Sequence, residues 1–399
     1  MKKVLFVCYG SGHVRMVVPV AQALAQRALA QAQVLALTTA HPVACEAGLD
    51  VLQFKDFVET GDEPALAHGR RLLADLGTVA DPEESMAYLG LSYAELESEV
   101  GAAEAAARYA RNGRQAFLPR ATLRRILKRV RPDVLVATNS PRAERAAIDS
   151  ARSLGIPAMC LVDLFCLDEV KWIGVPGYAD RVCVLNESVR QFLVDAGRDP
   201  AEIVATGNPA FDPICTPEMA ARGAQLRRDR GWRDRCVLLW PAQTEPAFHP
   251  FNGSPGDPTL PARALREVMD WVLARSDCVL CIRPRAGERV PELPEDPRVV
   301  LTGQDWPLHP LLHAVDLVVT LNSTVGLEGH LAGANLLQVL GSVFDAAMPL
   351  ERYGIAQAAV PVAGIGAALE RLREVPRRAP PAQVSSATDR VVEAMGVFL

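Results

Sequence analysis

The chain has 399 residues, more than one ordinary hydrophobic core holds, so its length predicts two or three domains. Hydrophobic residues make up 49% and charged residues 22%, the balance of a globular protein, and a net charge of −5 argues against nucleic acid as a partner. No apolar run reaches the roughly 18–20 residues that a membrane-spanning helix needs, so we expect a cytoplasmic protein. A peripheral contact with the inner face of the membrane is left open.

Strands and helices alternate in the first half of the chain. A predicted strand at Val4–Tyr9 is followed by a helix from about His13 to Ala30 and a strand at Val34–Leu37. Residues 64–129 are rich in Ala and Glu and predict a helical insertion. The remaining strands of this half are expected at Val51–Phe54, Val134–Ala137, Ala158–Val162, Arg181–Leu185 and Glu202–Ala205.

A second series of strands and helices begins after Gly207-Asn208-Pro209 and a polar helix at about Pro217–Arg230. Near-continuous apolar strands separated by helices are typical of parallel sheets covered on both faces. The sequence therefore predicts an α/β fold with two doubly wound, Rossmann-like domains facing across a cleft. We place the first domain at 1–208, the second at 209–385, and a terminal helix at 386–399 that crosses back to the first domain. The strands of the second series are expected at Cys236–Trp240, Val279–Ile282, Val299–Leu301, Leu317–Thr320 and Leu336–Leu340.

The first candidate site is the segment Gly10-Ser11-Gly12-His13-Val14-Arg15, directly after the first strand. Gly10 and Gly12 allow backbone N–H groups to approach a ligand, and the following helix N-terminus attracts anions. The segment is not a dinucleotide fingerprint, because Arg15 replaces the third glycine. His13 is the best general base in the chain, since imidazole titrates near neutral pH. The alternative is a histidine that only caps the helix.

Two further strand ends of the first domain carry polar side chains. The run Thr138–Glu144 contains Ser140, Arg142 and Glu144, which suit a sugar or a phosphate. Ser140 and Pro141 also fit an ordinary helix start, with the serine as cap. Asp163 follows the next strand and is a candidate for acid–base work, although loop carboxylates are usually just solvated.

The second domain offers candidate residues for binding a nucleotide. Gln243 follows its first strand, and Arg283 and Arg285 follow the next, where guanidinium groups would suit a diphosphate. Asn322, Ser323 and Thr324 open a helix and offer hydroxyls and N–H groups to phosphate. Glu328 lies one turn further on the same helix face, where a carboxylate would accept both ribose hydroxyls.

The cysteine and histidine patterns do not predict a metal site. The nine cysteines lie mostly in apolar runs and are expected to be reduced thiols. Cys278 and Cys281 have C-x-x-C spacing but belong to a predicted buried strand, and no second pair accompanies them. His309 and His313 stand one turn apart without an evident acidic third ligand, so we expect histidines on a helix surface.

Four segments resemble the GT-B superfamily, in particular bacterial UDP-sugar glycosyltransferases. Residues 10–24 are similar to the N-terminal loop of the lipid II GlcNAc transferase group and of the nucleotide-sugar hydrolase of the pseudaminic acid pathway. The TGNPAFDPI segment (206–214) resembles an interdomain segment found also in UDP-GlcNAc 2-epimerases and lipid A disaccharide synthase. Residues 322–339 are similar to the donor motif of capsule-type glycosyltransferases, and residues 343–356 to a final donor loop.

This resemblance implies a metal-independent glycosyltransferase without a cofactor, because the nucleotide sugar is a substrate. The donor, expected to be UDP-linked, would bind Gln243, Arg283, Asn322, Ser323, Thr324 and Glu328, together with Gly10 and Gly12. His13 would be the base or would bind the transferred sugar, with Asp163 as a second catalytic residue. The acceptor, a cell-surface glycan of polysaccharide biosynthesis, a natural product or a lipid-linked molecule, would meet Arg15, Ser140, Arg142 and Glu144.

Two departures from the family pattern leave alternatives open. Asp345 is followed by Ala346 where many family members have an Asp-Gln pair. The epimerases carry a His-Arg-x-x-Asn element after the first strand of the second domain, and here Gln243-Thr244-Glu245 stands there, with His249 displaced. Epimerisation or hydrolysis of a nucleotide sugar is therefore the second hypothesis, and a non-catalytic nucleotide-sugar-binding protein is the third. The chain is expected to be either a monomer or a homodimer.

Overall fold

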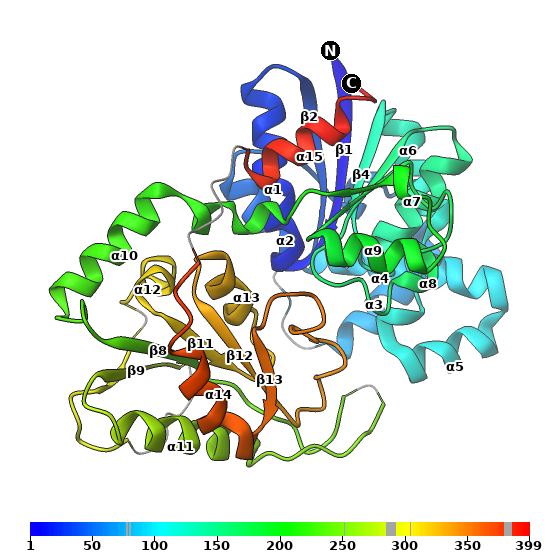
Figure 1. Cartoon of the computed structure of the whole chain (residues 1–399). Helices are drawn as coiled ribbons and strands as arrows, with labels where there is room; N and C mark the ends of the chain where they lie inside the picture. The colour runs from blue at the N-terminus through cyan, green and yellow to red at the C-terminus, as the bar shows by residue number, and fades with distance from the viewer. Residues whose placement is uncertain (77–78, 80, 251, 285–292, 304, 379–384) are drawn as a thin grey trace. The chain divides into compact units, whose positions relative to one another are not determined.

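The computed structural model describes the chain except for residues 77–78, 80, 251, 285–292, 304 and 379–384 (Figure 1). The described residues form two compact units. Unit 1 comprises Met1–Ala210 together with Ser385–Leu399, and unit 2 comprises Phe211–Val384. No helix in these described ranges is long and apolar enough to cross a lipid bilayer.

Unit 1 is built on a seven-stranded sheet in the order β3-β2-β1-β4-β5-β6-β7, in which every neighbouring pair is parallel. The strands are apolar runs because helices cover both faces, and residues 4–8 of β1 are wholly buried. The chain reverses its direction of sheet growth between β1 and β4, which creates a ligand-binding crevice at the carboxyl ends of these strands in doubly wound sheets. The strands are β1 (Lys2–Tyr9), β2 (Ala30–Leu37), β3 (Asp50–Leu52), β4 (Val134–Thr138), β5 (Ala158–Leu161), β6 (Arg181–Val184) and β7 (Ile203–Ala205).

The first helix differs from its prediction at both ends. Helix α1 (Gly10–Gln26) begins directly after β1, so the segment expected to be a glycine-rich loop is the start of the helix. The turn from strand to helix falls on Gly10, whose φ of 82° suits a residue without a Cβ. The helix ends before Ala30 because β2 pairs with β1 along its whole length, beginning at Ala30. The other helices on this sheet are α2 (Ala40–Glu46), α7 (Ala143–Ser153), α8 (Val170–Ile173) and α9 (Glu187–Asp195).

A helical segment lies between β3 and β4 in the sequence. Helices α3 and α4 approach so closely that a Cβ on Gly90 would lie 2.3 Å from the carbonyl oxygen of Ala65, and one on Gly69 would lie 2.1 Å from that of Met86. The two glycines therefore set the distance between these helices. The segment consists of α3 (Glu63–Ala74), α4 (Pro82–Val100), α5 (Ala102–Asn112) and α6 (Arg120–Val130).

The buried carboxyl group of Glu84 on α4 should make stability depend on pH. Glu84 is 3% exposed, and burial raises its pKa from 4.5 to about 7. The folded chain therefore binds this proton more tightly than the unfolded chain, and stability falls as pH rises from 4.5 through 7. Glu84→Gln lacks this titration, so between pH 4 and pH 8 its free energy of unfolding should gain about 3 kcal/mol over wild type. Urea unfolding at the two pH values measures the gain, and a pH-independent difference would contradict it.

The C-terminal helix α15 (Ala387–Met395) belongs to unit 1. Its Val391 and Met395 are fully buried in the core formed with α1, beside which it lies (Figure 1). Arg390 Nε donates to the carbonyl oxygen of Thr206, 2.8 Å away. The last helix of the chain thus completes the first sheet's helical cover.

Unit 2 repeats the plan of unit 1 with six parallel strands in the order β10-β9-β8-β11-β12-β13. Here the reversal falls between β8 and β11. Two doubly wound parallel sheets confirm the predicted fold class. The strands are β8 (Cys236–Pro241), β9 (Cys278–Arg283), β10 (Val299–Leu301), β11 (Leu317–Thr320), β12 (Asn335–Leu340) and β13 (Ala358–Pro361). The helices are α10 (Pro217–Asp229), α11 (Leu260–Leu273), α12 (Leu308–Ala314), α13 (Thr324–Leu331) and α14 (Ile365–Leu372).

Candidate functional site

A cluster of polar side chains occupies the point in unit 1 where the strand order reverses. His13 lies in the first turn of α1, Thr138 ends β4, Glu144 lies in the first turn of α7, and Asp163 follows β5. His13 Nδ1 is 3.0 Å from Thr138 Oγ1 and 3.7 Å from Glu144 Oε1, while Nε2 is 3.4 Å from Asp163 Oδ2. Three residues that the sequence singled out, His13, Glu144 and Asp163, thus lie together.

The two carboxyl groups determine the charge of His13. Burial by itself lowers its pKa, but the hydrogen bonds and charges of Asp163 and Glu144 outweigh burial and raise it to about 10. Burial likewise opposes ionisation of Asp163, yet the contacts with His13 hold the pKa of that carboxyl below its usual value. His13 is therefore protonated at pH 7. The predicted general base is therefore a cation at rest, which suits stabilisation of negative charge or proton donation.

Asp163 is held in place by two asparagines. Asn139 Nδ2 donates to Asp163 Oδ1 at 3.0 Å, and the Asp163 N–H donates to Asn139 Oδ1 at 3.2 Å. Asn208 Nδ2 donates to the carbonyl oxygen of Asp163 at 2.9 Å. The Asp163 side chain is still 34% exposed, whereas that of Glu144 is fully buried. Sequence reasoning did not assign this role to either asparagine; the available signal was an amide in the polar turn Gly207-Asn208-Pro209.

Arg142 and Ser140 lie at the same sheet edge, on the side of Tyr9. The Arg142 guanidinium stacks 4.0 Å from the centroid of the Tyr9 ring, and Arg114 Nη1 donates to the Tyr9 hydroxyl at 3.0 Å. Ser140 does not cap α7, as the sequence suggested, because that helix begins only at Ala143 and the φ and ψ of its N-cap, Arg142, are both −109°. Ser140 Oγ is buried and has no hydrogen-bond partner among the described residues.

The remaining first-domain candidates lie on the start of α1. Gly12 is exposed, and a Cβ built on it would meet nothing within 4 Å in the described part of the chain. Arg15 is exposed two residues after His13, so the two side chains leave the helix in different directions. The structure therefore does not bring Arg15 to the His13 cluster.

At the point in unit 2 where the strand order reverses, a hydrogen bond joins two residues that the sequence singled out. Gln243 follows β8 and Asn322 follows β11, and the Asn322 N–H donates to Gln243 Oε1 at 2.9 Å. Asn322 Nδ2 in turn donates to the hydroxyl of Ser342, in the turn after β12, at 2.7 Å. Gln243 is 6% exposed, so its side chain braces the loop that carries Asn322.

Glu245 connects the same site to the turn after β12. Its Oε2 accepts from the Ser342 hydroxyl and its Oε1 from the Val343 N–H, both at 2.7 Å. Glu245 is 6% exposed. Sequence reasoning noticed Glu245 in the polar turn after the first strand of the second domain but assigned it no role, and it overlooked Ser342. Small polar residues after a buried strand were the available signal.

We expect Glu245→Ala to loosen these loops. The change leaves the Ser342 hydroxyl and the Val343 N–H without a buried acceptor, which should cost about 1–3 kcal/mol for each group. Thermal unfolding should show a clear loss, whereas the exposed neighbour change Thr244→Ala should cost little. Equal unfolding temperatures for the two variants would contradict the bracing role.

The loop between β11 and α13 is organised by its own side chains. The Ser323 N–H donates to Thr320 Oγ1 at 3.1 Å, and Ser323 Oγ caps the helix by accepting from the Val325 N–H at 3.3 Å. Thr324 is exposed at the first helical position. A Cβ on Gly326 would lie 2.8 Å from Thr320 Cγ2, so this glycine lets α13 lie against β11.

Arg283 ends β9, and Glu328 lies on α13. Arg283 Nη1 donates to the carbonyl oxygen of Trp306 at 2.9 Å. Burial lowers the pKa of Arg283, while the charge of Glu328 opposes that change. The two predicted donor residues therefore interact electrostatically at the same sheet edge. Arg285, the second predicted guanidinium, lies outside the described residues.

One histidine of the pair on α12 differs from its prediction. His313 is 7% exposed, and its Nε2 contacts the carbonyl oxygen of Ile214 at 2.7 Å, so it is buried rather than on a helix surface. Helix α10 covers it, since Gly223 lies against it. Among the described residues, no group of three His, Cys, Asp or Glu side chains could hold a metal ion.

Comparisons with known proteins find similarity in structure alone. No protein-family model matches the chain, and no curated protein matches it in sequence. The chain is similar to the UDP-GlcNAc 2-epimerase of Neisseria meningitidis bound to UDP-GlcNAc, with a TM-score of 0.57, 11% identity and coverage of 99% of this chain and 100% of that one. It is also similar to the glycotransferase of kitacinnamycin, with a TM-score of 0.56, 16% identity and coverage of 100% and 99%.

A third similar structure is MurG of Acinetobacter baumannii, with a TM-score of 0.56, 15% identity and complete coverage of both chains. Each of the three similarities covers at least 99% of this chain. Over its full length, this chain has the GT-B fold of those enzymes.

Proposed function

We propose that this chain transfers a sugar from a UDP-linked donor to a hydroxyl group of an acceptor, without needing a metal ion. The proposal rests chiefly on the reversal point of unit 2, where Gln243 and Glu245 brace the Asn322 loop and the Ser342 turn. In doubly wound sheets this is where nucleotides bind. The proposed donor contacts are phosphate on the Asn322–Thr324 segment, the diphosphate on Arg283, and the ribose on Glu328.

The hydrogen bonds that Gln243 and Glu245 make in unit 2 also favour sugar transfer over epimerisation. Removing a proton from a sugar carbon requires a base beside that carbon. In the position where the epimerases carry His-Arg, this chain has Gln243 and Glu245, and both oxygens of Glu245 already accept hydrogen bonds. His249 is further along, where its Nδ1 accepts from the Asn252 N–H at 3.2 Å. A reaction at the anomeric carbon needs no base in that position.

The proposed chemistry assigns distinct roles within the His13 cluster. Asp163, partly exposed and with a lowered pKa, takes the proton of the acceptor hydroxyl. The acceptor oxygen bonds to the anomeric carbon while the bond from that carbon to the diphosphate oxygen breaks, and the nucleoside diphosphate leaves with the electron pair. His13 keeps its proton and stabilises the developing negative charge. Gly12, whose backbone is exposed, serves the donor together with Gly10, while Ser140, Arg142 and the buried Glu144 support the acceptor side.

Epimerisation or hydrolysis remains the second candidate, because the chain is as similar in structure to a UDP-GlcNAc 2-epimerase as to a glycotransferase. Incubation with UDP-GlcNAc alone, followed by NMR, separates the candidates. Transfer predicts an intact donor until an acceptor is added, and then stoichiometric release of UDP. Formation of UDP-ManNAc, or of UDP with free ManNAc, in the absence of acceptor would instead support the second candidate.

A further inference from the structure

A tyrosine at the carboxyl end of β1 contacts two arginines that come from distant parts of the sequence. Tyr9 is the last residue of β1 and directly precedes α1. The Arg142 guanidinium lies over its ring, 4.0 Å from the centroid, and Arg114 Nη1 donates to its hydroxyl at 3.0 Å. Arg114 belongs to the short helix η2 (Gly113–Ala116), which follows α5 in the helical segment. The helical segment thus brings a cation to the strand end that precedes the His13 cluster.

No carboxylate neutralises this arginine pair, Arg114 and Arg142. Neither member has an acidic partner in the described ranges, although other arginines of unit 1, such as Arg120 with Asp149, do form ion pairs. The two carboxylates of the neighbouring cluster contact His13 instead. The positive charge of the arginine pair is therefore available to a ligand.

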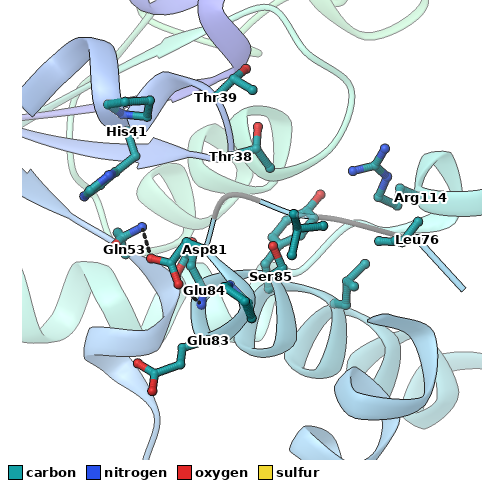
Figure 2. Close-up of a pocket in the computed structure, with 15 residues that line it drawn as sticks. Thr38, Thr39, His41, Gln53, Leu76, Asp81, Glu83, Glu84, Ser85 and Arg114 are labelled. Atoms are coloured by element: carbon teal, nitrogen blue, oxygen red, sulfur yellow. Dashed lines mark hydrogen bonds between the residues drawn. The ribbon is translucent and has the colours of Figure 1, made fainter. Parts of the chain in front are cut away.

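The acidic residues of α4 are also engaged elsewhere. Figure 2 shows Asp81, Glu83 and Glu84 on a different side of a neighbouring pocket from Arg114. Asp81 Oδ2 lies 2.6 Å from Lys55 Nζ, and Glu84 Oε2 accepts from the Lys55 N–H at 3.0 Å. Two positive charges held at one tyrosine ring repel each other, and an anion that contacts both would remove this repulsion.

A ligand can reach the arginine pair, because Tyr9, Arg114 and Arg142 are all partly exposed. Of the three guanidinium nitrogens of Arg142, only Nε is both buried and without a hydrogen bond. Stacking on Tyr9 holds this guanidinium while its two terminal nitrogens stay without a partner among the described residues. Arg114 uses Nη1 for the Tyr9 hydroxyl and keeps Nη2 and Nε for other contacts. A guanidinium presents planar N–H groups that match the oxygens of a carboxylate or a phosphate.

We propose that the arginine pair binds an oxyanion, a carboxylate or a phosphate group, that the acceptor carries in addition to the hydroxyl group that receives the sugar. The assignment to the acceptor rests on the proposed function, whereas the binding of an oxyanion does not. Arg142 is the N-cap of α7, whose first turn carries Glu144 of the His13 cluster. The acid group is therefore held beside that cluster, where Asp163 takes the proton of the acceptor hydroxyl. Arg114, which sequence reasoning did not single out, selects acidic acceptors over neutral ones.

The ring of Tyr9 can report oxyanion binding directly, because it contacts both arginines. The chain has six tyrosines, so NMR can follow the ring signals of isotope-labelled tyrosine, with Tyr9→Phe assigning the signal of Tyr9. The probes are inorganic phosphate, acetate and acetamide, the neutral analogue of acetate, titrated into the full chain at constant ionic strength without nucleotide. Arg114→Gln and Arg142→Gln each remove one charge. Arg111→Gln is the matched control, because Arg111 is exposed, lies one turn earlier in the same segment and pairs with Glu104 at 3.4 Å.

We expect phosphate and acetate to shift the Tyr9 signal until it saturates, and the tighter of the two identifies the preferred acid group. Acetamide should leave the signal unchanged. Arg114→Gln and Arg142→Gln should each weaken phosphate binding by about tenfold or more, the value of a charge-assisted hydrogen bond, whereas Arg111→Gln should bind like wild type. Equal responses to acetate and acetamide, or phosphate binding that neither change weakens, would overturn the proposal.

UDP affinity, measured by calorimetry, separates an acceptor site from a donor site. The proposal predicts that Arg142→Gln binds UDP as tightly as wild type does. A loss of UDP affinity that matches the loss of phosphate affinity would assign the arginine pair to the diphosphate of the donor and overturn the acceptor assignment. Absence of UDP binding in wild type would instead contradict the proposed function, and the phosphate titration, which contains no nucleotide, keeps that failure distinct.

Discussion

His13→Gln is expected to lower kcat for sugar transfer by about 10²–10³-fold while UDP affinity stays unchanged. The imidazolium lies between Asp163 and Glu144, 3.4 and 3.7 Å from their oxygens, and the neutral amide cannot replace its charge. Glutamine is preferred over alanine because it leaves no cavity beside the fully buried Glu144 carboxyl. Steady-state kinetics with UDP titration would measure both quantities.

The matched control is His68→Ala. His68 also pairs with a carboxylate in unit 1, Glu97 at 2.8 Å, but it lies on α3, away from the reversal point. Its replacement should leave kcat unchanged. An unchanged kcat in His13→Gln, or a loss of activity explained by loss of UDP binding, would contradict the assigned role.

The pH profile of wild type distinguishes a cationic His13 from a basic one. With a pKa of about 10, a cation that stabilises charge gives a kcat that is flat from pH 7 to 9 and falls toward pH 10. A general base would give a kcat that rises about tenfold per pH unit over the same range. The contacts of protonated His13 with Asp163 and Glu144 stabilise the fold, and this stabilisation is fully present below pH 6.5. It is lost as pH rises through about 10, so the free energy of unfolding of wild type should no longer exceed that of His13→Gln there.

Arg283→Ala is expected to weaken UDP binding by about 10–100-fold, the value of one charge-assisted hydrogen bond to phosphate. Arg283 ends β9, is held by the carbonyl oxygen of Trp306, and interacts with the charge of Glu328 across the sheet edge. Calorimetric titration with UDP measures the effect. Arg266→Ala, an exposed arginine on α11 of the same unit, should bind like wild type. Equal affinities in the two variants would remove Arg283 from the donor site.

The apolar strands explain why the architecture could be predicted from the sequence. Strands such as β1 and β11 are buried on both faces, so each is a continuous apolar run followed by a polar turn, which a single sequence shows directly. Strand β13 was missed because its four residues lie at a sheet edge and are only partly buried. The glycine-rich segment was placed in a loop because glycine usually interrupts helices, whereas here Gly10 makes the turn itself and α1 begins there.

The candidate site could be predicted only in part from the sequence. Residues that follow parallel strands meet at one sheet edge, so His13, Glu144 and Asp163 could be expected together. The charge states of these side chains could not be predicted, because the raised pKa of His13 depends on two carboxyl groups that are 131 and 150 residues away in the sequence. Ser342 was overlooked and Asn208 was assigned no role at the site, because their roles depend on hydrogen bonds that only the folded loops create.

The most direct test of the account is titration of the wild-type chain with UDP, ADP, GDP, CDP and TDP, followed by calorimetry. We predict that UDP binds most tightly and that both Arg283→Ala and Glu328→Gln weaken its binding. Absence of binding by all five nucleotides, or UDP binding that is unaffected by both changes, would contradict a nucleotide-sugar donor site at the reversal point of unit 2.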